Sequence, residues 1–333
     1  MERKGIALAG NILTDNVKFV QTYPEKGMLA TITSESLAVG GCVPNTGIDI
    51  AKLDKSMKVF AYGKVGDDYK GEYVVGEMKK VGIDVSGVKI SKTAPTSYSD
   101  VITVEETGER TFFHNRGANK EFCPEDVDLD SVSAKILHAG YLMLLDSFDK
   151  IGEDGTTPMS KFLKEARSKG IKTSIDIVSE SSGNFLKVVS SALPHCDYVI
   201  INEIEAGQIA GVEPRDEKGA LITENIEVII KKLMDMGVNE KVVIHCPEMG
   251  FALDKSGKYT FVPSIKLEKG FIKGSVGAGD AFCAGCLYAI YNDYSDEEML
   301  KFSNLVAINC LSAPDSVSGI RAKEKLSEVF DKK

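Results

Sequence analysis

The 333-residue sequence has no tryptophan, only four histidines and no apolar run approaching the roughly 20 residues that span a bilayer. The apolar stretch at residues 5–10 is too short for the apolar region of a signal peptide. Forty basic residues are scattered among 49 acidic ones, the formal net charge is −9, and no basic run forms a phosphate-binding stripe. We therefore expect neither a membrane nor a nucleic acid as a partner.

Several sequence signatures are also missing. The first strand is not followed by the Gly-x-Gly-x-x-Gly of dinucleotide-binding oxidoreductases, and no Walker Gly-x-x-x-x-Gly-Lys occurs. The histidines lack metal-ligand spacing, and no Ser–His or Cys–His nucleophile pattern is present, so neither a metalloenzyme nor a hydrolase is favoured. The seven scattered cysteines favour reduced thiols in a cytoplasm. Cys283 and Cys286, in an apolar helix, are better explained as small buried side chains than as a redox pair.

The chain alternates segments typical of buried strands with segments typical of helices. Such alternation predicts parallel βαβ units with right-handed crossovers, and so a layered α/β core. The expected strands are residues 4–10, 59–62, 135–140, 172–176, 198–201 and 242–245, and the expected helices are residues 67–81, 278–291, 295–311 and 321–330.

Two other segments alternate like exposed strands. They are residues 29–37 and residues 97–113, the latter interrupted by a turn at 106–109. No linker or repeat separates them from the core, so we expect a small sheet that interrupts one domain. The predicted core comprises residues 1–16, 38–96 and 119–333, and the predicted β lid comprises residues 17–37 and 97–118.

The most informative stretch is a glycine-rich turn, residues 273–279, that leads directly into an apolar helix. The backbone amides of Gly277, Ala278 and Gly279 would be free donors at the positive end of the helix dipole, which makes an anion hole. Asp280 follows in the first helical turn, where an ionised carboxylate could orient an alcohol and accept its proton late in phosphoryl transfer. Taken alone, the same residues could simply cap a core helix.

From Gly5 to about Gly319 the chain resembles the ribokinase, or PfkB, family of carbohydrate and nucleoside kinases. Residues 277–280 are similar to the family's C-terminal signature. The resemblance implies a ribokinase-like three-layer α/β/α (Rossmann-like) core with a small β-sheet lid. It also implies an anion hole at residues 277–279, Asp280 as general base, ATP as co-substrate and Mg²⁺ as its cofactor.

Residues 40–45, Gly-Gly-Cys-Val-Pro-Asn, resemble the family's N-terminal di-glycine signature. The resemblance implies that Gly40, Gly41 and Asn45 contact sugar hydroxyls, although the run could also be a capped turn. Asp15 follows the first strand, where the family places a carboxylate that grips two hydroxyls; an Asx-turn is the ordinary alternative. Asp146 matches a sugar-contacting acid of some members.

Five further residues are candidates for binding the nucleotide and its metal. Asn202 and Glu205 match the family's Asn-x-x-Glu element near the phosphates and the magnesium, Glu205 as the metal-associated acid. Being three apart on a helix, they share one face; the alternative is an N-cap with an exposed acid. His245 and Gly250 fall at the family's nucleotide-binding turn, and Asn304 is a candidate for the adenine pocket.

The chain departs from the family pattern at three places. Position 274 is Gly where many members have an Asp that helps to hold a monovalent cation, so dependence on such a cation stays open. The segment 245–247 is His-Cys-Pro in place of Thr-x-Gly. The residues between Gly41 and Asn45 are also unusual, which points to an unusual substrate.

Together these features predict an ATP-dependent kinase that phosphorylates a hydroxymethyl group of a small carbohydrate. A nucleoside kinase of the same fold is the first alternative, and a non-catalytic sugar-binding sensor is the alternative of another class. Exposed apolar residues in the lid segments, such as Leu29 and Phe112, could pair two chains as in some relatives, so a homodimer through the lid is expected.

Overall fold

The computed structural model describes residues 3–178 and 183–331. Its core is a nine-stranded sheet in the order β13-β12-β11-β10-β9-β8-β1-β4-β5. All neighbours pair parallel except β11 with β12 and β12 with β13, which are antiparallel. The strands are β1 (Ile6–Gly10), β4 (Val59–Gly66), β5 (Asp84–Ser91), β8 (Ile136–Leu142), β9 (Lys172–Ile177), β10 (Tyr198–Asn202), β11 (Lys241–His245), β12 (Met249–Asp254) and β13 (Tyr259–Pro263).

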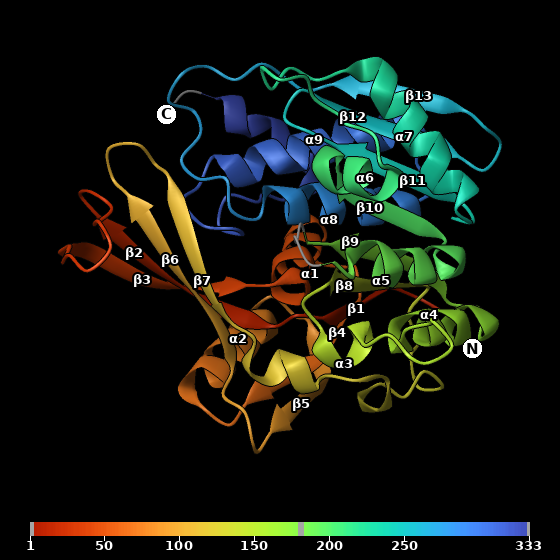
Figure 1. Cartoon of the computed structure of the whole chain (residues 1–333), viewed down its shortest axis with the longest axis horizontal. Coiled ribbons are helices and arrows are strands. Elements are labelled where there is room, and N and C mark those ends of the chain that lie inside the picture. The colour runs from red at the N-terminus through yellow and green to blue at the C-terminus, as the bar shows by residue number, and fades with distance from the viewer. Residues whose placement is uncertain (1–2, 179–182, 332–333) are drawn as a thin grey trace.

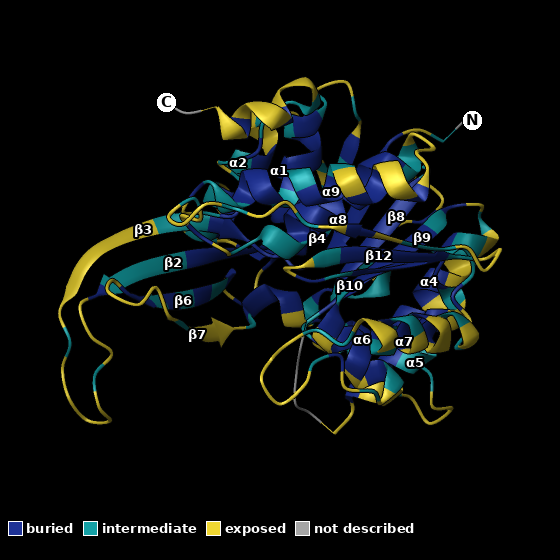
Figure 2. Ribbon diagram, turned by 90° about the horizontal axis from the view of Figure 1, so that it is seen from above, coloured by how far each residue is buried: buried dark blue, intermediate teal, exposed yellow. Residues whose placement is uncertain are grey.

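Helices cover both faces of this sheet (Figure 2). One face carries α1 (Cys42–Leu53), α2 (Tyr69–Lys80), α8 (Ala278–Tyr291) and α9 (Asp296–Leu311). The other carries α4 (Pro158–Ser168), α5 (Phe185–Ala192), α6 (Glu203–Ala210) and α7 (Thr223–Asp235). Along β1, Ile6 and Leu8 pack into the first layer while Ala7 and Ala9 pack into the second, the period-two pattern of a strand buried on both faces. The three-layer α/β/α core predicted from the sequence is confirmed.

A separate four-stranded sheet projects from one side of the core (Figure 1). Its order is β3-β2-β6-β7, with β2 parallel to β6 and the other pairs antiparallel. The strands are β2 (Leu13–Val20), β3 (Ile32–Gly40), β6 (Ser97–Val104) and β7 (Arg110–Asn115). The sequence reading missed β2, because Asp15 and Asn16 are typical of turns, and pairing with β3 and β6 overrides that local preference.

Two other expectations need correction. The strand expected at 29–37 begins at Ile32 and continues to Gly40. The segment expected as a helix at 321–330 is a 3-10 helix, η4 (Lys323–Phe330). Its buried side chains, Leu326 and Val329, are three residues apart, which fits a helix of three residues per turn.

The remaining short elements are α3 (Asp146–Asp149), η1 (Gly117–Glu121), η2 (Pro124–Asp126) and η3 (Leu193–His195). Within the described ranges, none of the helices combines the length and apolarity that a membrane crossing requires. The carboxyl ends of β1, β8, β9, β10 and β11 meet at one edge of the core sheet, where open α/β sheets place their ligands.

Candidate active site

Asp280 lies in the first turn of α8, almost fully buried, and is held by two other elements. Its Oδ2 accepts a hydrogen bond from Nδ2 of Asn45 at 2.9 Å, and both carboxylate oxygens lie 2.8 Å from the hydroxyl of Tyr141, which donates. Burial raises the pKa of Asp280 to about 6, although these hydrogen bonds act to lower it. The group is therefore an ionised acceptor at neutral pH, with its lone pairs directed by Asn45 and Tyr141.

Tyr141 is a member of this site that the sequence reading missed. It stands near the carboxyl end of β8, it is half-buried, and its hydroxyl donates to the carboxylate of Asp280. A buried tyrosine hydroxyl normally finds a hydrogen-bond partner, which here is the carboxylate. Only the expected position of β8 beside β1 could have pointed to it.

The glycine-rich segment, predicted to form an anion hole, leads into the start of α8. Gly277 precedes α8 with φ 79°, and a side chain there would place its Cβ 2.4 Å from Cβ of Ser316. The Ala278 amide makes only a long contact, 3.4 Å, to the carbonyl of Ser275. A Cβ on Gly279 would stand 3.4 Å from the ring of His245. The amides of residues 277–279 thus lie at a helix N-terminus, where a side chain at Gly277 would collide with Ser316 and one at Gly279 would only touch His245.

Ser316 joins this segment to the di-glycine region. Its hydroxyl donates to Oδ1 of Asn45 at 2.8 Å, so Asn45 bridges Ser316 and Asp280. Gly41 opens α1 with φ 91°, and a Cβ there would lie 2.6 Å from the carbonyl oxygen of Asn11. The di-glycine run therefore brings the start of α1 against β1 and the start of α8.

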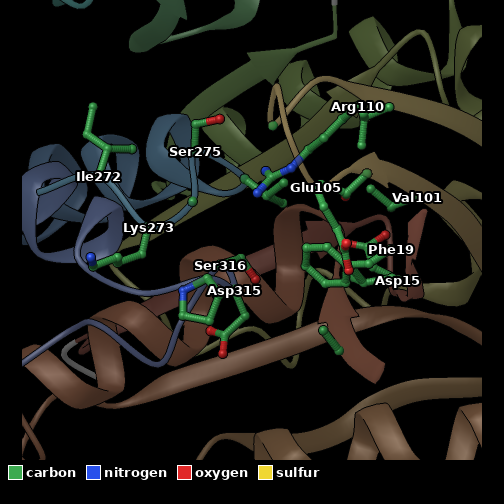
Figure 3. Close-up of a pocket in the computed structure, with 18 of the residues that line it drawn as sticks. Asp15, Phe19, Val101, Glu105, Arg110, Ile272, Lys273, Ser275, Asp315 and Ser316 are labelled. Carbon is green, nitrogen blue, oxygen red and sulfur yellow. The ribbon is translucent and has the colours of Figure 1, made fainter. Parts of the chain in front are cut away.

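A cavity of about 400 Å³ opens between the small sheet and the segments 272–276 and 314–316 (Figure 3). Asp15 of β2 and Arg110 of β7 face it from the small sheet. Burial, and then the nearby charge of Asp280, raise the pKa of Asp15 to about 7. A Cβ on Gly40 would lie 2.7 Å from Oδ2 of Asp15, so glycine at 40 makes room for this carboxylate.

The cavity has a mixed lining suited to a polyol. Nη1 of Arg110 is buried and has no hydrogen-bond partner in the described part of the chain. Phe19 and Val101 supply an apolar wall. Asp146 is absent from the described residues that line the cavity; it is exposed on α3 and pairs with Arg116.

His245 of β11, Gly250 of β12 and Asn304 of α9 belong to elements that pack beside α8. The His245 ring packs against Phe282 with centroids 4.9 Å apart, and burial lowers the pKa of His245 to about 4, so the imidazole is neutral. Gly250 pairs with His245 from within β12 and not from a turn, and a Cβ there would press on Leu300 at 3.1 Å. Asn304 is buried on α9, and its Nδ2 has no partner among the described residues.

Asn202 and Glu205 form a reciprocal capping box at the start of α6. Oδ1 of Asn202 accepts from the Glu205 amide at 2.9 Å, and Oε2 of Glu205 accepts from the Asn202 amide at 3.2 Å. Glu205 is buried, contrary to the alternative of an exposed acid. The pKa of the neighbouring Asp176 is raised well above its usual range by burial and then by the charge of Glu205.

These buried acids fit a divalent cation. Oxygen ligands are what Mg²⁺ prefers, and Glu205 and Asn202 offer them at the sheet edge that faces α8. The mutual repulsion of Glu205, Asp176 and Asp280 would be relieved by a positive charge placed among them.

Fold and site together define a carbohydrate kinase. The family model of pfkB family carbohydrate kinases matches residues 5–321, and the chain belongs to this family. It is accordingly an ATP-dependent phosphotransferase.

Named relatives agree with this assignment. The chain is 26% identical to the probable chloroplastic fructokinase-6 of Arabidopsis thaliana, covering 98% of this chain and 86% of that protein. It is 24% identical to ribokinase of Schizosaccharomyces pombe, covering 90% and 89%. Arabidopsis thaliana ribokinase, solved with ribose and ATP, has a TM-score of 0.80 at 18% identity, covering 99% and 100%. Methanocaldococcus jannaschii nucleoside kinase has a TM-score of 0.74 at 18% identity, covering 100% and 99%.

Proposed function

We propose that this kinase transfers the γ-phosphoryl group of ATP to a hydroxymethyl group of a small sugar, as in ribokinases and fructokinases, with Asp280 as the general base. The observation that carries the proposal is the position of Asp280. Its carboxylate is ionised and oriented by Asn45 and Tyr141, and the helix on which it lies follows directly after residues 272–276, which line the cavity.

The proposed chemistry divides into charge stabilisation and proton transfer. The amides of residues 277–279 would stabilise the migrating phosphoryl charge at the N-terminus of α8. Asp280 would orient the attacking hydroxyl and accept its proton late, because the transition state of phosphoryl transfer is loose. Mg²⁺ would supply neutralisation of the phosphate charge when bound, with Glu205 and Asn202 helping to hold it and its waters.

The sugar is proposed to lie in the cavity between the small sheet and the 272–276 segment. Asp15, partly protonated near neutral pH, can both donate to and accept from hydroxyls. The proposed substrate contacts are completed by Gly40, Gly41, Asn45 and, by resemblance alone, Asp146. Closure of the lid, residues 17–37 and 97–118, over this cavity would exclude water and limit ATP hydrolysis.

The nucleotide is proposed to lie across α8 from the sugar. His245 beside Gly279, Gly250 behind it and the unpaired amide of Asn304 would border ATP. Gly274 packs against backbone carbonyls, and a Cβ there would lie 2.7 Å from the carbonyl oxygen of Pro314, so no side chain at 274 can serve a monovalent cation.

The protein is also proposed to form a homodimer and to be located in the cytoplasm. Leu29, Ile32 and Phe112 are exposed on or beside the small sheet, which suits a homodimer through the lid. The seven cysteines are unpaired, as a cytoplasmic location would predict.

A nucleoside acceptor is the second candidate. The apolar wall of Phe19 and Val101 in the cavity could receive a base. A sensor without catalysis is disfavoured, since it would need neither the oriented carboxylate of Asp280 nor the anion-binding helix start.

An ADP-release assay with ribose, fructose and adenosine tests the proposal. We expect release with a sugar, and a kcat at least about 100-fold lower in Asp280→Asn, since general bases contribute about that much. Asp130→Asn, a change at an exposed acid, is the control and should match the wild type.

Three outcomes would count against the proposal. Near-native turnover in Asp280→Asn would reject the base. Preferred turnover of adenosine would select the nucleoside kinase. Thermal stabilisation by a sugar without ADP release would select the sensor.

A further inference from the structure

Three potential metal ligands meet one helical turn beyond Asp280. They are His138 of β8, Asp176 of β9 and Cys283 of α8, and one ligand atom of each lies within 4.8 Å of the other two. All three side chains are buried. They are far apart in the sequence, so spacing alone gave no sign of them. None of the three has a residue-specific role in the kinase reaction proposed above, although Asp176 is one of the acids whose repulsion a cation at this sheet edge would relieve.

The register of β8 and β9 explains why His138, Asp176 and Cys283 lie close together. His138 pairs directly with Ser174 of β9, and Asp176, two residues further, points to the same face of the sheet as Ser174. Helix α8 covers that face, and Cys283 is three residues after Asp280 on this helix. The result is a cluster of nitrogen, oxygen and sulfur ligand atoms between sheet and helix, one helical turn from Asp280.

The histidine is already oriented as a ligand. Its Nδ1 lies 3.0 Å from the hydroxyl of Ser174, which can accept a proton from it, and its Nε2 lies 3.7 Å from Sγ of Cys283. A metal-bound histidine typically donates its second ring N–H to such a partner, which fixes the ring and the tautomer. Burial lowers the pKa of His138 to about 3, so the ring is in the neutral, metal-binding form.

Once ionised, the Asp176 carboxylate would be stabilised by a positive partner. One oxygen of Asp176 accepts from the Ile177 amide at 2.7 Å. No lysine or arginine of residues 3–178 and 183–331 forms an ion pair with it. Its neighbours include Glu205 and Asp280, which are acids. A buried carboxylate in this setting gains from a cation more than an exposed one does.

The ligand chemistry selects the metal. Zn–N and Zn–S bonds of about 2.0 and 2.3 Å at a tetrahedral angle separate the two ligand atoms by about 3.5 Å. The 3.7 Å between His138 Nε2 and Cys283 Sγ is close to that separation. A set of imidazole, thiolate and carboxylate suits Zn²⁺ or Co²⁺, whereas Mg²⁺ takes oxygen.

We propose that His138, Asp176 and Cys283 bind one borderline transition-metal ion, Zn²⁺ or a chemically similar ion, separately from the magnesium of ATP. Binding releases two protons, one from the Cys283 thiol and one from the Asp176 carboxyl, and forms one bond to each ligand atom. Water completes the fourth position. Cys42 lies near Asp176 but is not one of the three clustered ligands: its Sγ is 2.8 Å, and Cβ of Asp176 3.4 Å, from where a Cβ on Gly140 would stand.

Such an ion would join α8 to two strands of the core. The catalytic helix would then be fixed relative to β8 and β9, and ion binding would stabilise the native state as the free metal concentration rises. The proposal is independent of which acceptor the kinase uses.

Cobalt binding to the chelator-stripped full chain tests the proposal. In excess Mg²⁺ we expect one Co²⁺ per chain, a thiolate-to-cobalt charge-transfer band, and loss of that band when Zn²⁺ is added. Cys283→Ser should abolish the band, and His138→Gln should weaken Co²⁺ binding at least about tenfold, as the loss of one ligand does. Cys286→Ser is the matched control, because Cys286 is buried on the same helix but contacts Ser303.

A band of equal strength in Cys283→Ser, or no band in the wild type, would overturn the proposal. Circular dichroism would verify that each variant is folded. Crystals of the wild type soaked in Co²⁺ give a test without variants: an anomalous peak among the three side chains supports the site, and a peak elsewhere only, or none, overturns it. Kinase activity enters neither readout, so failure here and failure of the proposed function are distinguishable.

Discussion

Two acids on the same helix lie in opposite electrostatic surroundings. Asp49, inside α1, is fully buried; burial and then the charge of Asp280 raise its pKa well above the usual range, and neither of its oxygens has a hydrogen-bond partner among the described residues. Asp54, which ends the same helix, is also desolvated, but hydrogen bonds from Lys323, Ser56 and Tyr288 hold its pKa well below the usual range.

The same contrast separates Asp54 from the other buried acids around Asp280. Asp15, Asp176 and Asp280 share the raised pKa of Asp49, with burial as the largest cause in each. Uncompensated buried carboxylates oppose folding. Asp15, Asp49 and Asp176 each owe part of the raised pKa to the charge of Asp280, so the four acids form one uncompensated cluster, whereas hydrogen bonds compensate Asp54 at the end of α1.

The largest expected effect comes from closing the anion hole. Gly277→Ala places a Cβ 2.4 Å from Ser316 and should displace the amides of the helix start. We expect kcat/KM for ATP to fall at least about 100-fold, the size of losing one oxyanion donor. Gly257→Ala is the matched control: its φ is also positive, 85°, but nothing lies within 4 Å of the new Cβ. Unchanged ATP turnover in Gly277→Ala would place the phosphate elsewhere.

The next effect concerns pH. The pKa of Asp280 is about 6, so kcat/KM should fall about tenfold for each unit below that pH as the base is protonated. Tyr141→Phe removes a donor that favours the ionised form, and the acidic limb should move up by about one pH unit. Tyr288→Phe, which removes the corresponding tyrosine bond to Asp54, should leave the limb in place. If the acidic side of the kcat/KM pH profile did not move in Tyr141→Phe, Tyr141 would not be stabilising the ionised form of Asp280.

A smaller effect should appear in stability at Asp49. The folded-state pKa of Asp49 exceeds the ordinary aspartate pKa of 3.8. Below pH 3.8 the group therefore costs the fold no stability, and the loss of stability grows as pH rises from 3.8 toward the folded-state pKa. Asp49→Asn should raise Tm by roughly 2–4 °C at pH 8 and less at pH 5. Thermal unfolding at both pH values checks this. A lower Tm at pH 8 would mean that the carboxylate has a cation partner in solution.

The smallest effect, of opposite sign, is expected at Asp54. Because the pKa of Asp54 is lowered by folding, its ionised carboxylate stabilises the folded state at pH values above the ordinary pKa of 3.8. This stabilisation is lost as the pH falls through the folded-state pKa. Asp54→Asn should destabilise the fold by about 1 kcal/mol at pH 7, the size of a partly exposed ion pair, measured by urea unfolding. If Asp49→Asn and Asp54→Asn changed stability in the same direction, the proposed difference between the two regions would be wrong.

The sequence reading succeeded where local patterns determine the structure. The apolar run of β1 and the glycine-rich start of α8 are contiguous signals, and the alternation of strands and helices predicted the layered core. It failed where residues distant in the sequence determine the local structure. Pairing with β3 and β6 makes β2 a strand despite its Asp-Asn.

The same distinction holds within the site. Asp280 and Asn45 were found through motifs, and the structure joins them by a hydrogen bond. No motif identified Tyr141 or Ser316, because their roles depend on contacts across more than 100 positions. Gly250 was expected in a turn, but antiparallel pairing of β12 with β11 extends the strand to include it.

The most direct test is a crystal structure with Mg²⁺ and a non-hydrolysable ATP analogue. The account predicts that the terminal phosphorus lies against the amides of residues 277–279, within reach of a hydroxyl bound to the Asp280 carboxylate. A terminal phosphate bound away from the start of α8 would contradict it.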